Sequence, residues 1–128
     1  MREKLARKVS ELIEGPNFAQ LATLMPDGSP QVTTVWIDHD GEIIRVNTAK
    51  GRVKYINVMR DPRVAISITR HKNPYEQAVI RGRVIEVTED EAEEHIDQLS
   101  RKYTGADFQK PSGQKRVIIK IRPTKVTV

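Results

Sequence analysis

The stretch RVNTAKGRVKYINVMRDPR, residues 45–63, is the most informative segment of this chain. Alternating side chains at its start predict a β-strand, and Ala49-Lys50-Gly51 predicts a turn. The residues from Arg52 onward have the pattern of a short helix, which Asp61-Pro62 ends. This strand–turn–helix corner carries the basic residues Arg45, Lys50, Arg52, Lys54, Arg60 and Arg63.

Arg52 and Lys54 lie where the short helix begins, which is the end that favours negative charge. Cations at this end lose stability unless an anion compensates, and no acidic residue lies three or four positions away from either side chain. Asn57, three residues after Lys54, shares its helix face. Helix N-termini bind phosphate readily, and Arg and Lys add charge-assisted hydrogen bonds. We therefore predict that a phosphate-bearing ligand binds at this corner.

The overall composition is that of an ordinary globular chain with an excess of basic residues. None of the 128 residues is a cysteine, which excludes disulfides and thiolate metal sites. No apolar run approaches the ~20 residues that span a membrane, and the N-terminus has no apolar signal region. We expect one cytoplasmic domain over residues 1–128. The net charge of +5 is compatible with nucleic acid, anionic lipid or an acidic small molecule.

The first half of the chain predicts one helix and three strands. Helical spacing of Leu5, Val9, Leu12 and Ile13 predicts a helix over residues 2–14. Strands are predicted over residues 18–24, 31–37 and 42–48, separated by turns at Pro26-Asp27-Gly28-Ser29 and Asp38-His39-Asp40-Gly41. The short helix that follows carries a one-sided apolar stripe of Val53, Ile56 and Met59.

The second half predicts three more strands and one longer helix. The strands are expected over residues 64–69, 78–87 and 116–128, the helix over 92–103, and connections over 71–75 and 105–115. Thr88 to Glu91 has the capping-box pattern, and Gly82 predicts a bulge or a close backbone approach. Antiparallel hairpins with peripheral helices indicate an α+β, mainly β chain, folded as a barrel or a strongly curved sheet.

Several kinds of catalytic site find no support in the sequence. His39, His71 and His95 show no metal-ligand spacing, and we interpret them as solvated or turn histidines. No phosphate-binding loop, dinucleotide fingerprint or G-x-S-x-G motif is present. We interpret Asp38 and Asp40 as turn formers, and Glu89-Asp90-Glu91 as acidic residues that suit a helix N-terminus.

Trp36 is the only tryptophan, and it follows Thr33, Thr34 and Val35 in a predicted strand. It serves either as a core or interface residue or as an aromatic wall for a flat ring. In the second case Thr33 and Thr34 offer hydroxyl and backbone groups to ring heteroatoms.

Four motifs together resemble a known family. They are Ala22-Thr23-Leu24-x-Pro26-Asp27-Gly28-Ser29-Pro30-Gln31-Val32-Thr33, Ile44-Arg45-Val46-Asn47-Thr48, Arg52-x-Lys54-x-x-Asn57-x-x-x-Asp61-Pro62-Arg63-Val64-Ala65 and Arg81-Gly82-Arg83-Val84. Their order and spacing resemble the pyridoxamine 5′-phosphate oxidase-like split-barrel proteins that bind flavin or deazaflavin. Asn73-Pro74-Tyr75 and Lys102-Tyr103-x-Gly105 are similar to the branch that depends on the deazaflavin coenzyme F420.

The resemblance implies a six-to-seven-stranded antiparallel split β-barrel with peripheral helices, paired as a homodimer with cofactor sites at the interface. It implies that Arg52 and Lys54 meet the cofactor phosphate, with Asn57 nearby, and that Asn47 and Thr48 line the cofactor. The strand under the cofactor ring would supply Gln31, Thr33, Thr34, Val35 and Trp36, and Gln77 would contact the ring from a second layer. Lys50, Arg60 and Arg63 would attract the acidic oligoglutamate tail of F420.

These residues leave three functional hypotheses open. The first is an F420-dependent oxidoreductase that passes a hydride to an unsaturated organic substrate, and the second is an FMN-dependent protein with the same phosphate site. The third is a non-enzymatic carrier or a basic nucleic-acid-binding barrel, although only 5% of the residues are aromatic. The chain lacks the longer C-terminal region with which true pyridoxamine phosphate oxidases bind their substrate, which argues against vitamin B6 oxidation.

Overall fold

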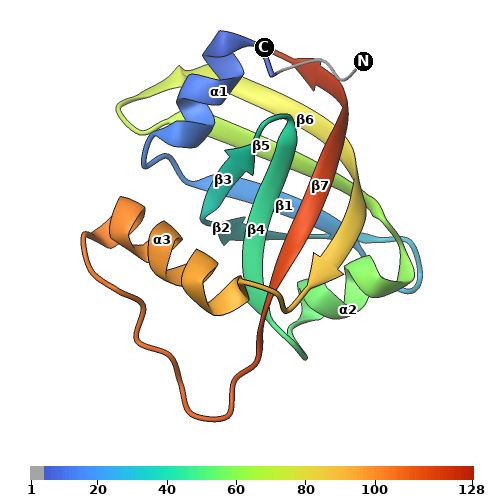
Figure 1. The fold of residues 1–128 in the computed structure, drawn as a ribbon. Coiled ribbons are helices and arrows are strands. Elements are labelled where there is room, and N and C mark those ends of the chain that lie inside the picture. The colour runs from blue at the N-terminus through green and yellow to red at the C-terminus, as the bar shows by residue number, and fades with distance from the viewer. Residues whose placement is uncertain (1–4) are drawn as a thin grey trace.

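A seven-stranded antiparallel sheet forms the centre of the computed structural model, which describes residues 5–128 (Figure 1). The strands are β1 (Ala19–Leu24), β2 (Pro30–Val35), β3 (Ile37–Asp40), β4 (Ile43–Ala49), β5 (Arg63–Arg70), β6 (Asn73–Thr88) and β7 (Arg116–Thr127). Across the sheet they follow the order β2-β1-β5-β6-β7-β4-β3. This arrangement confirms the α+β, mainly β fold that the sequence predicts.

The two edge strands of the sheet are neighbours in the sequence. β2 ends at Val35 and β3 begins at Ile37, yet the two strands lie at opposite ends of the strand order. Consecutive Cα atoms are about 3.8 Å apart, so Trp36 can join these edges only if the sheet curls until they meet. The result is a barrel that is split along the seam between β2 and β3, as the resemblance implied.

Three helices accompany the barrel: α1 (Arg7–Glu14), α2 (Val53–Arg60) and α3 (Ala92–Thr104). In Figure 1, α1 and α2 lie at opposite ends of the barrel, and α3 runs beside β4. The predicted spacing in α1 is confirmed, because Val9, Leu12 and Ile13 are all buried against the barrel. The part of this predicted helix before residue 5 lies outside the described residues.

The core fills the inside of the barrel with aliphatic side chains from alternate positions on each strand. Leu21, Ile66 and Ile80 face one another in register on β1, β5 and β6, and each is at most 1% exposed. Val46 and Ile119 are paired in the same way on β4 and β7. Each such side chain stabilises the fold by roughly 1.5–3 kcal/mol relative to an exposed position.

Gly82 lies at the close approach that the sequence predicted. A Cβ atom at this position would lie 2.7 Å from Cγ2 of Ile121 and 2.8 Å from the carbonyl oxygen of Arg122. The register between β6 and β7 also shifts between Arg81 and Gly82, so the predicted bulge is present as well. No side chain fits here without moving the backbone of β7.

The prediction of a strand over residues 31–37 followed by a turn at 38–41 was wrong. The strand breaks at Trp36, and Asp38, His39 and Asp40 belong to β3. The turn of the β3–β4 hairpin lies after Asp40, where Gly41 adopts a φ of 61°. An aspartate fits in β3 because Arg45, directly opposite Asp38 in register, neutralises its carboxylate with two hydrogen bonds.

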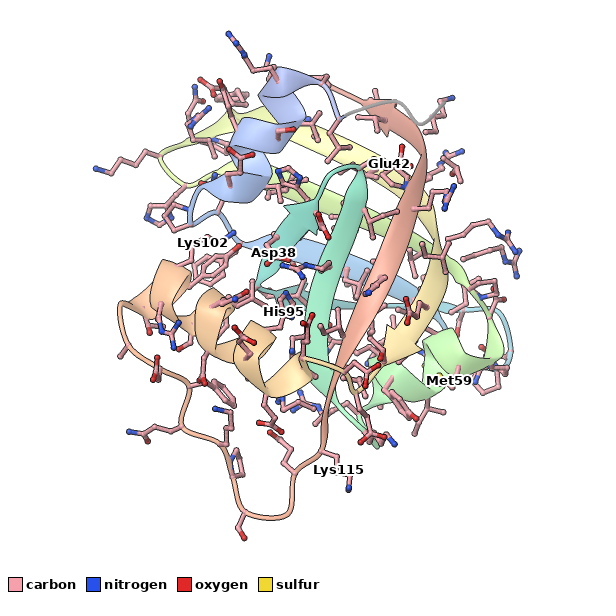
Figure 2. All side chains as sticks on the ribbon, viewed as in Figure 1. Asp38, Glu42, Met59, His95, Lys102 and Lys115 are labelled. Carbon is pink, nitrogen blue, oxygen red and sulfur yellow. The ribbon has the colours of Figure 1, made fainter. Side chains whose placement is uncertain are left out.

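The apolar stripe of α2 does not face the core. Val53, Ile56 and Met59 are between 43% and 59% exposed, whereas Lys54, Asn57 and Val58 are buried. Figure 2 shows Met59 on α2, at the end of the molecule away from α3. The helix therefore presents its polar side chains inward and leaves an apolar face exposed.

Two further expectations were wrong in detail. No side chain caps the N-terminus of α3, because Thr88 ends β6 and bonds the N–H of Asp90, while Glu91 adopts a left-handed φ of 62°. The connection expected over 71–75 is shorter, since β6 already begins at Asn73.

Gly82→Ala should lower the free energy of unfolding by roughly 1–3 kcal/mol, because the added methyl group collides with the backbone of β7. Urea denaturation of this variant and of wild type measures the effect. Lys125→Ala, an exposed position on β7, serves as the control and should leave stability nearly unchanged. Equal stability of Gly82→Ala and wild type would contradict the close approach.

Candidate functional site

A cavity of about 260 Å³ opens at the seam of the barrel, where β2 passes through Trp36 into β3. It brings together residues from the end of β2, the end of β4, the start of α2, the middle of α3 and the start of β7. The residues that line it are Phe18, Thr34, Val35, Trp36, Asn47, Thr48, Arg52, Lys54, Ile96, Leu99, Phe108 and Arg116.

Three cations share this cavity, and among the described residues no carboxylate lines it. Lys54 is only 7% exposed, and within residues 5–128 it makes neither a hydrogen bond nor an ion pair. Burial lowers the pKa of Lys54, and the positive charges of Arg52 and Arg116 lower it further. A buried charge normally has a partner, so this cluster has the electrostatic character of an anion site.

Arg116 completes the cluster, and the sequence analysis missed it. Its Nε donates to Oδ1 of Asn47 at 2.8 Å, its Nη1 donates to Oε1 of Gln114 at 2.9 Å, and its guanidinium lies 5.0 Å from the ring centre of Phe108. Burial lowers the pKa of Arg116, as does the charge of Arg52. Only the pairing of β4 with β7, which sets Arg116 opposite Ala49, brings it to the corner.

Aromatic side chains form the other wall of the cavity. The rings of Trp36 and Tyr103 are stacked, with centroids 5.5 Å apart and an angle of 9° between their planes. Phe108 meets Trp36 edge-on at 6.3 Å, and Phe18 packs against Tyr103 at 5.4 Å. One side of the Trp36 ring is therefore packed against Tyr103, and the residue also lines the cavity; its role as an aromatic wall for a flat ring stays a prediction.

Buried polar contacts hold this wall in place. The hydroxyl of Tyr103 accepts from the N–H of Ile37 at 3.2 Å and donates to the carbonyl of Asn17 at 2.7 Å. Its neighbour Lys102 donates to the carbonyls of Ile13 and Ile37. Burial lowers the pKa of Lys102 to about 8, and burial raises the pKa of Tyr103 to about 12. These contacts tie α3 to α1 and to β3.

The prediction that all three histidines are solvated or turn residues was wrong for His95. It is 2% exposed, with Nε2 3.0 Å from Oδ1 of Asp38 and Nδ1 3.1 Å from Nδ2 of Asn47. His39 binds Glu14 through Nε2, whereas His71 is exposed. Within residues 5–128, no group of three or more His, Cys, Asp or Glu side chains is arranged to hold a metal ion.

The cavity contains seven of the twelve predicted cofactor residues: Thr34, Val35, Trp36, Asn47, Thr48, Arg52 and Lys54. The other five do not line it. Asn57 is buried behind Lys54, where its Nδ2 donates to Oγ1 of Thr23 at 3.0 Å. Gln31 lies in β2, opposite Thr23 of β1, and Gln77 is exposed on β6. The Oγ1 of Thr33 is buried without a hydrogen-bond partner among the described residues.

Lys50, the fifth of these residues, forms an ion pair with Glu89 at 2.5 Å. The other two cations expected to attract an acidic tail are also engaged within the chain. Arg63 pairs with Asp61, and Arg60 donates to Oδ1 of Asn57. Lys50 and Arg63 are thus paired with carboxylates, whereas Arg60 bonds a neutral amide oxygen.

Comparison with known families decides the classification. Residues 5–128 match the family described as pyridoxamine 5′-phosphate oxidase. The chain belongs to this family. The pyridoxamine 5′-phosphate oxidase family explains the split barrel, and the resemblance noted in the sequence is confirmed.

Solved structures of other proteins are similar over nearly the whole chain. An F420 reductase is 35% identical, with a TM-score of 0.83 over 92% of this chain and 94% of the reductase. A conserved hypothetical protein from Mycobacterium tuberculosis is 23% identical, with a TM-score of 0.73 over 98% and 82%. General Stress Protein 26 from Bacillus anthracis is 20% identical, with a TM-score of 0.71 over 93% and 88%. The last two show the fold alone.

Lys54→Met should raise the free energy of unfolding of the ligand-free protein by about 0.5–2 kcal/mol, because it removes a buried charge that lies beside two arginines. Urea denaturation at pH 7 measures the change. Lys72→Met, at an exposed position, is the matched control and should have little effect. A less stable Lys54→Met variant would show that Lys54 has a stabilising partner.

Lys102 should make stability rise with pH between about 8 and 10.5. Its folded pKa of about 8 lies below the ordinary 10.5, so the unfolded chain binds more protons in this window. Thermal unfolding at pH 8, 9 and 10 compares wild type with Lys102→Met. As the pH rises, the melting temperature of wild type should increase relative to that of Lys102→Met. Parallel curves would contradict the lowered pKa.

Proposed function

We propose that this chain binds coenzyme F420 in the seam cavity and acts as an F420-dependent oxidoreductase. The observation that carries the proposal is the cluster of Arg52, Lys54 and Arg116 in this cavity. Among the described residues, no carboxylate lines the cavity. An anionic cofactor supplies the missing negative charge, and the 35% identity to an F420 reductase supports this choice of cofactor.

The residues present fit such a cofactor. Arg52, Lys54 and Arg116 would hold its phosphate with charge-assisted hydrogen bonds. Trp36 and Phe108, which meet edge-on, line the part of the cavity where its ring system would lie, next to Thr34 and Val35. Asn57 supports this site from behind, because it fixes the buried face of α2 on which Lys54 lies.

When bound and reduced, F420 supplies a hydride for an unsaturated or conjugated organic substrate. The residues of this chain bind and orient the reactants and exclude water from them. Among the described residues, the cavity lining includes no carboxyl or imidazole group. We therefore assign no general acid to the chain, and a proton that the reaction needs would come from water.

A second copy of the chain would complete the site. At about 260 Å³, the cavity is smaller than the roughly 300–1,000 Å³ typical of pockets that enclose a ligand. Thr34, which borders the cavity, also lies on the outer sheet face with Val32 and Val79, which are 60% and 42% exposed. We propose that this face forms a homodimer, so that the partner covers the open side of the cofactor.

The same outer face offers space and charge for this contact. It contains a second cavity of about 550 Å³, which includes Ala22 and Ala65 and is bordered by Arg81. Gln77 lies on this face, directly opposite Thr69 in β5. In the homodimer that we propose, Gln77 would reach the cofactor bound to the partner, which accounts for its absence from the cavity of its own chain.

FMN is the alternative cofactor, because it also carries a phosphate on a ribityl chain and would use the same cations.

Nucleic acid remains the less favoured ligand, since Trp36 and Phe108 pack against each other at the cavity rather than forming an open stacking surface. No helix among the described residues is long and apolar enough to cross a membrane. The cytoplasmic location stays a prediction.

Titration with F420 and, in parallel, with FMN tests the proposal, with Trp36 fluorescence as the signal. Tight F420 binding and weak FMN binding are expected, and Lys54→Ala should weaken F420 binding by roughly 1–3 kcal/mol, the scale of a hydrogen bond to a charged group. Lys72→Ala is the control for a general loss of positive charge. The reverse cofactor preference would assign the chain to FMN, and binding of neither would overturn the cofactor proposal.

A further inference from the structure

A chain of polar groups, of which His95 is buried and the others are half-buried, runs from β3 through α3 to the cavity. Asp38 contacts His95, His95 contacts Asn47, and Asn47 contacts Arg116, with successive distances of 3.0, 3.1 and 2.8 Å. Figure 2 shows Asp38 and His95 close together, between α3 and the β3–β4 hairpin. Of these four residues, only Asn47 and Arg116 line the cavity.

Two neighbours fix the orientation of the Asn47 side chain. The Nε–H of Arg116 can only donate, so the atom that faces it must be the amide oxygen. The carbonyl of Ala92 can only accept, so the amide nitrogen must face it, at 2.9 Å. The same amide nitrogen therefore donates its second hydrogen to Nδ1 of His95.

This orientation determines the protonation of His95. Because Nδ1 accepts from Asn47, it carries no hydrogen. The hydrogen of the neutral ring is then on Nε2, which donates to the carboxylate of Asp38. His95 is thus held as the neutral Nε2–H tautomer, and its two ring nitrogens have opposite roles.

The charged groups around His95 come from every element that packs near it. Asp38 from β3 is bound by two nitrogens of Arg45 from β4, and these bonds, with that of His95, hold the pKa of Asp38 down although burial would raise it. Further charges are carried by Glu91 just before α3, by Glu94 on α3, by Lys102 near Asp38, and by Arg116 and Lys120 on β7.

A second proton on His95 would disturb Arg116. With hydrogens on both nitrogens, Nδ1 becomes a donor that faces the amide hydrogens of Asn47. If the amide turns to offer its oxygen to His95, its nitrogen faces the Nε–H of Arg116, and the bond to Ala92 is lost as well. In this turned arrangement, Arg116 loses its hydrogen bond to Asn47 and keeps only the one to Gln114.

We propose that His95 and Asp38 are positioning residues for Arg116, and that protonation of His95 breaks the hydrogen bond from Arg116 to Asn47 and weakens binding of an anionic cofactor. The inference rests on the proposed function for the identity of the anion, but the coupling between His95 and Arg116 belongs to the chain alone. The geometry thus makes cofactor affinity sensitive to pH through a residue that does not line the cavity.

Nitrogen-15 NMR of the ligand-free protein tests the coupling directly. At pH 7.5 we expect the Nε2–H tautomer for His95, and we expect the Nε–H signal of Arg116 to shift or broaden as His95 titrates. The ring-nitrogen signals of His95 are assigned by their loss in the variant His95→Gln. The amide of this glutamine offers an acceptor and a donor in place of the two ring nitrogens. An Nδ1–H tautomer of His95, or an Arg116 Nε–H signal that does not change as His95 titrates, would overturn the proposal.

Binding of F420 between pH 8 and pH 5.5 provides the second test. Wild-type affinity should fall by about tenfold over this range, the scale of one lost hydrogen bond to a charged group. His95→Gln should lose this pH dependence and should bind more tightly at pH 8 than His95→Leu. His39→Gln, which removes a histidine that also faces a carboxylate, should keep the wild-type dependence.

The two tests separate failure of this inference from failure of the proposed function. If wild type does not bind F420 at pH 8, the cofactor proposal fails, and the NMR result alone decides whether His95 positions Arg116. If wild type binds F420 and His95→Gln retains the pH dependence, the positioning role is refuted while the cofactor stands. Thermal unfolding of each variant at both pH values confirms that the comparison is made on folded protein.

Discussion

The single residue between β2 and β3 is the constraint on which the structure depends. Trp36 joins two strands that lie at opposite edges of a seven-stranded sheet, so the sheet has to curl until these edges meet. The seam that results is where the barrel remains open, and the cavity lies there because no ladder of hydrogen bonds closes it. The same residue supplies part of the cavity wall, where Tyr103 stacks against it. The position of Trp36 between β2 and β3 therefore determines both how the sheet curls and where the cavity lies.

The charge distribution of the cavity fits the anionic ligand that we propose. Burial and the charges of Arg52 and Arg116 lower the pKa of Lys54, which is buried without a partner among the described residues. Such an arrangement lowers the stability of the free protein. A ligand that binds only the folded state raises the stability again. Two other cations near the corner, Lys50 and Arg63, are paired with Glu89 and Asp61.

Local signals in the sequence predicted most of the fold and the centre of the site. The corner was visible because Arg52 and Lys54 lacked acidic neighbours along the helix. Arg116 was not visible, since it reaches the corner through the pairing of β4 with β7 across a large separation in sequence. Asp38 and His95 were misjudged because turn chemistry and polarity are local properties, whereas their burial depends on α3 packing against β4. The stripe on α2 was real, but periodicity does not tell which face of a helix meets the core.

A crystal structure of the protein with bound F420 tests the central claim most directly. The account predicts that the phosphate lies within hydrogen-bond distance of Lys54 and at least one of Arg52 and Arg116, with the ring system beside Trp36 at the seam of the barrel. Cofactor bound elsewhere on the molecule, with these cations left without an anion, would contradict it.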